Sequence, residues 1–270
     1  MKKKMIQSIF LLVILLNVSV CAQAQGSKIA REMKEYIDAG IKIKPKTSYS
    51  PTVITSSESD PPMSIGGQIV DDANSVIYKA FSLHPEWKNS LVVADWTGSM
   101  YPYVGQVMRW HKVNIGKKLL KYLVLFNDGN DKLRESEFKP IGSTGGIYHA
   151  DPNDMDDFLK KVEIAVNNGS GGDAEENDIE AILEGIETYS DIDYVILIAD
   201  NSPVRDIELL RKINKPVHVI LCDNGWVIDY IKIAYKTGGS ITTMQDELDF
   251  SNKNIIDPKN IILEGIKYKL

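Results

Sequence analysis

Short runs of Val, Ile and Leu constrain this sequence most, because they alternate along the chain with segments of helical spacing. Four such runs lie at residues 91–94, 119–126, 194–199 and 217–221. Apart from Lys121 and His218 they are apolar without alternation, which is typical of strands that are covered on both faces. Alternating strands and helices favour a parallel sheet with helices on both sides. We therefore expect an α/β fold of the Rossmann-like, three-layer type, with a mostly parallel central sheet.

Apolar residues at helical spacing predict the helices between these strands. Two shorter strands are expected at residues 146–149 and 240–243. The expected helices span residues 27–39, 71–83, 102–111, 154–166, 176–189, 204–213, 226–237 and 258–268.

The N-terminus has the three parts of a secretory signal peptide. Lys2, Lys3 and Lys4 precede an apolar run at residues 9–20, and Ala22-Gln23-Ala24 is a small-x-small cleavage site. A membrane-spanning helix needs ~20 apolar residues, so this run is too short. The pattern predicts a signal peptide over residues 1–24 and an exported chain, periplasmic or extracellular, with no stable transmembrane span after cleavage. The alternatives are an uncleaved anchor and lipidation at Cys21, which the preceding Val20 disfavours.

The remaining chain divides into two parts. Residues 25–89 are expected to form an N-terminal helical and extended segment, with an extended arm at residues 42–62, and residues 90–270 to form the α/β domain. Cleavage would leave Cys222 as the one cysteine, which excludes an internal disulfide. With 31 basic and 37 acidic residues and no long basic cluster, the composition argues against nucleic acid as a partner.

Candidate ligands follow two of the strands, at the edge of the sheet where open α/β folds bind ligands. The first strand runs into Asp95-Trp96-Thr97-Gly98-Ser99, which places one carboxylate and two hydroxyls at alternate positions of one turn. Asp200 follows the strand at residues 194–199. Hard oxygen ligands suit Mg²⁺ or Mn²⁺. The simpler alternative is that Asp95 caps a helix and that Thr97 and Ser99 are turn residues.

These residues resemble the metal-ion-dependent adhesion site (MIDAS) of von Willebrand factor A (vWA) domains, whose pattern is Asp-x-Ser/Thr-x-Ser after the first strand. Asp95, Thr97 and Ser99 match it in order and spacing, and Asp200 matches the family's last metal residue. Residues 171–176 are similar to a Gly-Gly-Asp-x-Pro-Glu loop of the family, with Glu175 in place of Pro. The resemblance covers about residues 90–248, including a Gly-Gly turn at 238–239.

The resemblance implies that Thr97 and Ser99 ligate Mg²⁺ or Mn²⁺ directly, and that Asp95 and Asp200 act through water. Asp173 stands where integrin-type members usually have Thr. Its charge should tighten metal binding and weaken the pull of the metal on a partner carboxylate. Glu176 is a further candidate ligand.

Trp96 and Tyr101 flank this turn and are candidates for an aromatic rim that contacts a partner. Packing against neighbouring loops is the alternative for both. The function that the resemblance implies is an exported, metal-ion-dependent protein-binding module whose protein partner is unknown.

Two other functions stay open: a Mg²⁺-dependent hydrolase on the same scaffold, and a scaffold protein with a vestigial metal site. The catalytic motifs of several enzyme classes are incomplete. Position 97 is Thr where haloacid-dehalogenase phosphatases have their second Asp, and Thr144 stands where a serine-hydrolase elbow needs its nucleophile. We therefore expect binding rather than catalysis.

Overall fold

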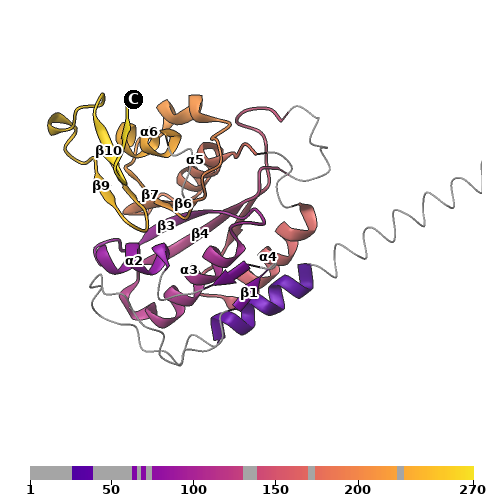
Figure 1. Cartoon of the computed structure of the whole chain (residues 1–270). Helices are drawn as coiled ribbons and strands as arrows, with labels where there is room; N and C mark the ends of the chain where they lie inside the picture. The colour runs from indigo at the N-terminus through magenta and orange to yellow at the C-terminus, as the bar shows by residue number, and fades with distance from the viewer. Residues whose placement is uncertain are drawn as a thin grey trace, which may run out of the picture.

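The computed structural model describes residues 26–38, 63–65, 68–70, 75–129, 139–169, 174–223 and 228–270. At its centre is a seven-stranded sheet in the order β5-β4-β3-β6-β7-β8-β9 (Figure 1). The strands that run parallel are β4 (Leu120–Phe126), β3 (Ser90–Asp95), β6 (Tyr194–Ala199), β7 (Val217–Leu221) and β8 (Ser240–Thr242). The outer strands β5 (Ile147–Ala150) and β9 (Glu247–Asp249) are antiparallel to their neighbours. The predicted mostly parallel α/β sheet is confirmed.

Helices cover both faces of the sheet, which makes three layers (Figure 1). One face carries the helix at residues 26–38 with α2 (Val76–Leu83), α3 (Tyr101–Val113) and α4 (Met155–Asn168). The other face carries α5 (Asp178–Thr188), the 3₁₀ helix η4 (Ile207–Lys212) and α6 (Ile228–Thr237). Two further 3₁₀ turns are η3 (Ile115–Lys117) and η5 (Lys253–Ile255), and a separate hairpin pairs β1 (Met63–Ile65) with β2 (Gln68–Val70).

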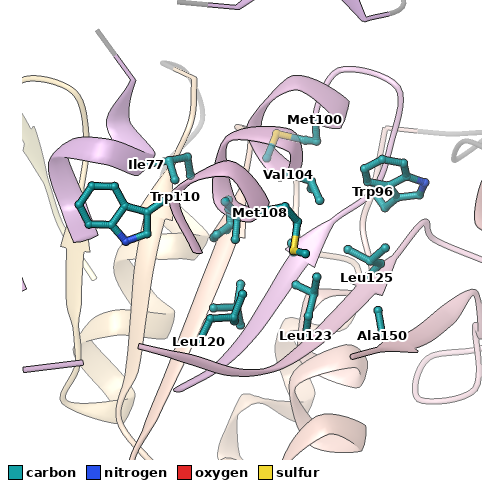
Figure 2. Packing of buried hydrophobic residues seen from close by; sticks show 14 of the residues in the cluster. Ile77, Trp96, Met100, Val104, Met108, Trp110, Leu120, Leu123, Leu125 and Ala150 are labelled. Atoms are coloured by element: carbon teal, nitrogen blue, oxygen red, sulfur yellow. The ribbon is translucent and has the colours of Figure 1, made fainter. Parts of the chain in front are cut away.

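Each face of the sheet has its own apolar core, because successive side chains of a strand point to opposite faces. In β3, Val92 and Ala94 face α3, whereas Leu91 and Val93 face α5. Figure 2 shows the first core, in which Val104 and Met108 of α3 lie over the sheet. The same alternation decides on which side each residue at the end of a strand emerges.

The helix at residues 26–38 belongs to the layer that covers the first core. Its side chains Met33 and Ile37 are fully buried in that core. A Cβ added to Gly105 of α3 would lie 2.7 Å from the Met33 sulfur, so the two helices approach closely at this glycine. The Arg109 guanidinium lies 4.6 Å from the ring centroid of Tyr36. This part of the N-terminal segment therefore packs directly on the α/β domain, while the predicted arm at 42–62 lies outside the described residues.

The prediction of a helix at residues 258–268 is wrong. This segment forms an antiparallel hairpin of β10 (Ile261–Leu263) and β11 (Ile266–Tyr268). Glu264 and Gly265 connect the strands with φ values of 49° and 76°. Two consecutive residues with positive φ suit a tight hairpin turn and cannot continue a right-handed helix.

The segment predicted as a helix at residues 204–213 forms only the 3₁₀ helix η4. Its first residues are engaged elsewhere, since Val204 forms a parallel bridge with Glu176. The Asp206 carboxylate accepts hydrogen bonds from the backbone N–H groups of Ile179 and Glu180 at 3.1 and 2.6 Å. Too few residues remain for an α-helix.

Candidate metal centre

The predicted ligands lie at the point where the strand order of the sheet reverses. β4 pairs with one side of β3 and β6 with the other, and β7 continues beyond β6. Asp95 is the last residue of β3 and Asp200 comes directly after β6. From these two strands the chain continues toward opposite edges of the sheet, and open α/β folds bind ligands outside the carboxyl ends of strands at such a point.

Hydrogen bonds bring the two strand ends together. The Ser99 hydroxyl donates to Asp200 Oδ2 at 2.8 Å, although these residues are 101 positions apart in the sequence. Ser99 Oγ also lies 3.4 Å from Thr97 Oγ1. The Thr97 backbone N–H donates to Asp95 Oδ1 at 2.7 Å, and the Ser202 N–H donates to Asp200 Oδ1 at 2.8 Å. Four of the predicted ligands therefore form one local group.

Asp95 is a fully buried carboxylate whose second oxygen, Oδ2, has no hydrogen-bond partner among the described residues. Burial, followed by the charge of Asp200, raises the pKa of Asp95 to about 8. An unpaired charge in this position is unfavourable, because a buried carboxylate normally has a cation or several donors beside it.

Glu176 lies in the interior beside Asp95, not on a rim. Its backbone N–H donates to the Pro203 carbonyl at 2.9 Å, and its own carbonyl accepts from the Arg205 N–H at 2.8 Å, which ties it to the loop after Asp200. The side chain is 3% exposed and Oε2 has no partner among the described residues. Burial and then the charge of Asp95 raise its pKa well above the usual range.

Two further buried polar groups adjoin this site from α5 and α6. Both carboxylate oxygens of Asp178 and the hydroxyl of Tyr230 lack hydrogen-bond partners within the described ranges. Burial raises the pKa values of both groups, with Asp206 the leading charge for Asp178 and Asp178 for Tyr230. The interior behind Asp95 is therefore acidic and polar, which the sequence reasoning did not foresee.

Asp128 is another acidic residue that was missed, and it is paired. It follows the end of β4 and binds Lys139 and Arg205, with Arg205 Nη2 2.9 Å from Asp128 Oδ2. Arg205 also contacts Glu175 at 3.3 Å. Examining the residues after β4, as was done for β3 and β6, would have identified Asp128.

Trp96 and Tyr101 do not form the exposed aromatic rim that was one of their two predicted roles. Trp96 is 0% and Tyr101 4% exposed, and their rings stack at a centroid distance of 4.4 Å. The reason is the alternation along β3: Trp96 continues the series of Val92 and Ala94 and so enters the first core. Asp95 consequently points to the opposite face, toward Glu176.

Two further sequence-based predictions concern Asp173 and Cys222. Asp173 lies outside the described residues. Cys222 is half-buried and free, and burial followed by the charges of Asp200 and Asp95 raises its thiol pKa well above the usual range, which disfavours a nucleophilic thiolate.

Within the described ranges, no three side chains of His, Cys, Asp or Glu are grouped so that they could hold a metal ion by themselves. A metal at this site would therefore depend on the two hydroxyls and on water as well as on carboxylates. Among the same residues, no helix has the length and apolar character needed to cross a bilayer. Compared with known proteins, the chain matches no family model, no curated protein and no solved structure.

Proposed function

We propose that this protein is a vWA-like binding module that holds Mg²⁺ or Mn²⁺ at the carboxyl ends of β3 and β6 and docks a protein partner there. The observation that carries the proposal is the contact of Ser99 with Asp200, with Thr97 beside it. It gathers the predicted ligands from two strands at the edge of the sheet that open α/β folds use for ligands.

The spacing of the oxygens fits an octahedral ion. Adjacent ligands of Mg²⁺, each 2.0–2.1 Å from the metal, lie about 3 Å apart. The two oxygens proposed as direct ligands, Ser99 Oγ and Thr97 Oγ1, lie 3.4 Å apart, and the 2.8 Å contact of Ser99 Oγ with Asp200 Oδ2 is the hydrogen bond that holds Asp200 beside them. Thr97 and Ser99 would ligate the ion directly, and Asp95 and Asp200 would bind its coordinated waters.

The charge around the site also favours a cation. Beside burial, the charge of Asp200 raises the pKa of Asp95, and the charge of Asp95 raises that of Glu176. One oxygen each of Asp95 and Glu176 has no partner among the described residues. A bound divalent ion would compensate these carboxylates and supply one open coordination position for an oxygen of the partner. Asp173, predicted to add a further carboxylate, would strengthen the hold on the ion.

The partner is proposed to be a protein met outside the cytoplasm, in line with the predicted signal peptide. Because the site is rich in carboxylates, a neutral oxygen from the partner, such as a hydroxyl or an amide, suits the open position better than another carboxylate does.

Calorimetric titration of Mg²⁺ and Mn²⁺ into chelator-treated mature protein tests the metal. We expect binding at one site, its loss in Ser99→Ala, and its retention in Ser202→Ala, a serine whose bond to Asp200 comes from its backbone. No binding to the wild type would refute the metal proposal, and full binding by Ser99→Ala would place the metal elsewhere.

Partner docking requires a second test. Crosslinked capture from the extracytoplasmic fraction, with Mg²⁺ or with chelator, should recover the same protein only with Mg²⁺ and only with an intact Ser99. Equal capture with Mg²⁺ and with chelator, and by the wild type and Ser99→Ala, would refute metal-dependent docking. Metal-dependent turnover of phosphate or ester substrates would instead favour the hydrolase alternative.

A further inference from the structure

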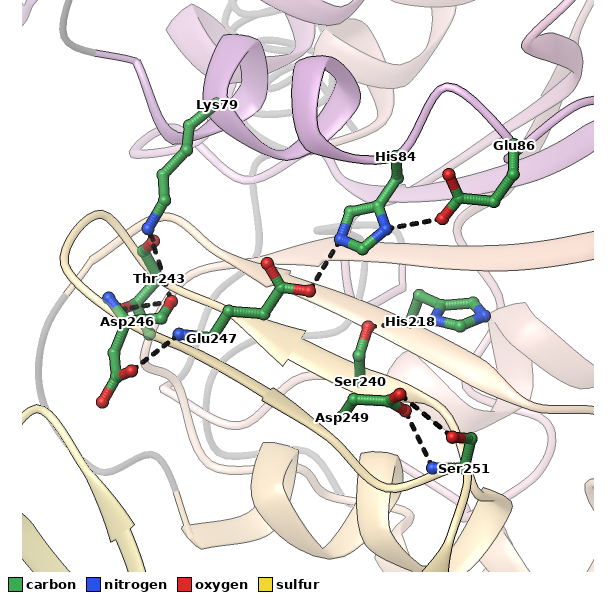
Figure 3. A network of polar contacts seen from close by, with 10 residues as sticks. All are labelled: Lys79, His84, Glu86, His218, Ser240, Thr243, Asp246, Glu247, Asp249 and Ser251. Carbon is green, nitrogen blue, oxygen red and sulfur yellow. Dashed lines mark hydrogen bonds and ion pairs between the residues drawn. The ribbon is translucent and has the colours of Figure 1, made fainter. Parts of the chain in front are cut away.

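Lys79 of α2 and His84, which follows that helix directly, contact the hairpin formed by β8 and β9 (Figure 3). The Lys79 ammonium donates to the carbonyls of Thr243 and Met244 at 2.9 and 3.1 Å, in the turn between these strands. Five residues further on, at the end of α2, the His84 ring contacts Glu247 of β9. The two contacts connect an N-terminal helix to the last strand of the sheet, more than 160 residues later.

The geometry of His84 favours a proton on both ring nitrogens. Nδ1 lies 2.7 Å from a carboxylate oxygen of Glu86, and Nε2 lies 2.7 Å from one of Glu247. A neutral imidazole has a single N–H, so it donates to one carboxylate and presents a lone pair to the other. Only the imidazolium form donates to both, and both bonds are then charge-assisted.

The ring packing favours the same charge state. The His84 ring stacks on Trp87 at a centroid distance of 4.0 Å and an interplanar angle of 7°. A cation over an indole face is stabilised by the electrons of the ring. The side chains of His84 and Glu247 are 17% and 27% exposed, so water screens their contact less than it screens the contact with Glu86, which is 53% exposed.

We propose that His84 is a proton-controlled latch that holds edge strand β9 against α2. β9 has three residues, and Leu248 supplies its one apolar side chain, which is only partly buried. The position of this strand therefore depends strongly on polar contacts. When His84 loses its proton, the contact with Glu247 or with Glu86 becomes repulsive and β9 separates more readily from α2, with Lys79 as the remaining tie.

Burial and hydrogen bonding shift the pKa of His84 in opposite directions. Burial lowers the pKa of His84, but the hydrogen bonds to Glu247 and Glu86 outweigh burial and raise it above 6.5. The stabilisation by this latch is therefore complete below pH 6.5 and is lost as the pH rises through the raised pKa of the folded state.

A second histidine, His218 of β7, also lies against Trp87, at a ring-centroid distance of 5.0 Å, and its Nδ1 is hydrogen-bonded to the Ser240 hydroxyl at 2.9 Å. Burial and the charge of His84 lower its pKa to about 4, against the weaker opposing charges of Asp249, Glu86 and Glu247. His218 therefore stays neutral over the range in which His84 titrates. Further charges near the latch are those of Lys79, Asp246 and Glu264.

Amide hydrogen exchange of the mature protein at about pH 6 and about pH 8.5, corrected for intrinsic exchange chemistry, tests the latch. Peptides from residues 76–84 and 240–250 should lose protection at the higher pH, by about tenfold for each unit by which the His84 pKa is raised, while β3 should not. His84→Gln should show low protection at both pH values. The matched variant His218→Gln should keep the pH dependence of the wild type.

Equal corrected protection of the wild-type hairpin at both pH values would overturn the proposal, as would a pH dependence that persists in His84→Gln. If His84→Gln does not fold, an NMR titration of the wild-type imidazoles decides. A His84 ring that titrates at or below pH 6.5 overturns the latch, and one that titrates above it supports the latch.

Discussion

Asp95→Asn should make the metal-free protein more stable at neutral pH, although it removes a predicted ligand. In the folded chain the pKa of Asp95 is raised from 3.8 to about 8, chiefly by burial. A carboxyl whose pKa is raised on folding contributes stability below its unfolded pKa, and that contribution is lost as the pH rises toward the folded pKa. Metal-free protein at pH 7 therefore carries an unfavourable contribution from Asp95, which an uncharged amide of the same shape removes.

The expected difference in unfolding free energy follows from the pKa shift of Asp95. About four pKa units at ~1.4 kcal/mol each give on the order of 5 kcal/mol above pH 8, and about 4 kcal/mol at pH 7. The amide keeps an oxygen for the Thr97 N–H, which Asp95 Oδ1 accepts at 2.7 Å, so no compensating hydrogen bond is lost. Below about pH 4 the wild type and the variant should have the same stability, because Asp95 is then protonated in both states.

Urea unfolding in chelator at about pH 4 and about pH 7, analysed with a common m-value, measures the difference. Mg²⁺ at ~100 times its Kd should narrow the difference at pH 7 from about 4 to about 1 kcal/mol, since it adds about 2.7 kcal/mol to the wild type alone. An Asp95→Asn variant that is less stable than the wild type in chelator at pH 7 would refute the electrostatic reasoning. The same difference at both pH values would also refute it.

Three further substitutions test the scaffold, each by urea unfolding with circular dichroism. Asp206→Ala, measured at about pH 4, should lower the unfolding free energy by about 1–2 kcal/mol, because it removes the cap that this carboxyl group forms on the N-terminus of α5; an increase would contradict the cap. The low pH is chosen because burial raises the pKa of Asp206 to about 6, so that its charge at neutral pH opposes the cap. Met33→Ala should lower it by about 2–5 kcal/mol, and a change below ~0.5 kcal/mol would show that the helix at 26–38 is not packed on α3. Gly239→Ala should prevent stable folding, because the new Cβ would lie 1.8 Å from the Val217 carbonyl oxygen, whereas Gly116→Ala, with no atom within 4 Å, should be tolerated.

The layered fold could be predicted because its signals are local. The continuous apolar runs became β3, β4, β6 and β7 with their boundaries shifted by one residue at most. α4 begins one residue after the predicted start at residue 154, where the Asp154 carboxylate accepts hydrogen bonds from the N–H groups of Asp156 and Asp157. Local spacing also placed Asp95 and Asp200 at adjacent strand ends, because strand direction in a parallel sheet follows from the alternation of elements.

The errors occurred where a local pattern supports two structures. Residues 258–268 have apolar side chains that suit one turn of helix or a short strand equally, and the Glu264-Gly265 turn decides between them through its positive φ angles. Trp96 suits either an exposed loop or the core by its sequence position. The alternation of β3 continues one residue beyond the strand and places Trp96 in the same core as Val92 and Ala94.

Other contacts had no sequence signal at all. His84 and Glu247 are 163 residues apart, and neither follows a predicted strand end. Their contact arises only from the docking of α2 beside the last strand, so it becomes visible only in the folded chain.

The short antiparallel strands at the two ends of the sheet also bear on how the molecules behave in concentrated solution. A parallel sheet of apolar strands would offer, at an open end, a long row of backbone groups to which another chain could add. Here the sheet ends in strands of four and three residues, and β9 carries two carboxylates, Glu247 and Asp249. A second copy that aligned with β9 would find few hydrogen-bonding positions and would bring like charges together. The apolar strands are thereby shielded from open-ended polymerisation by the chain itself.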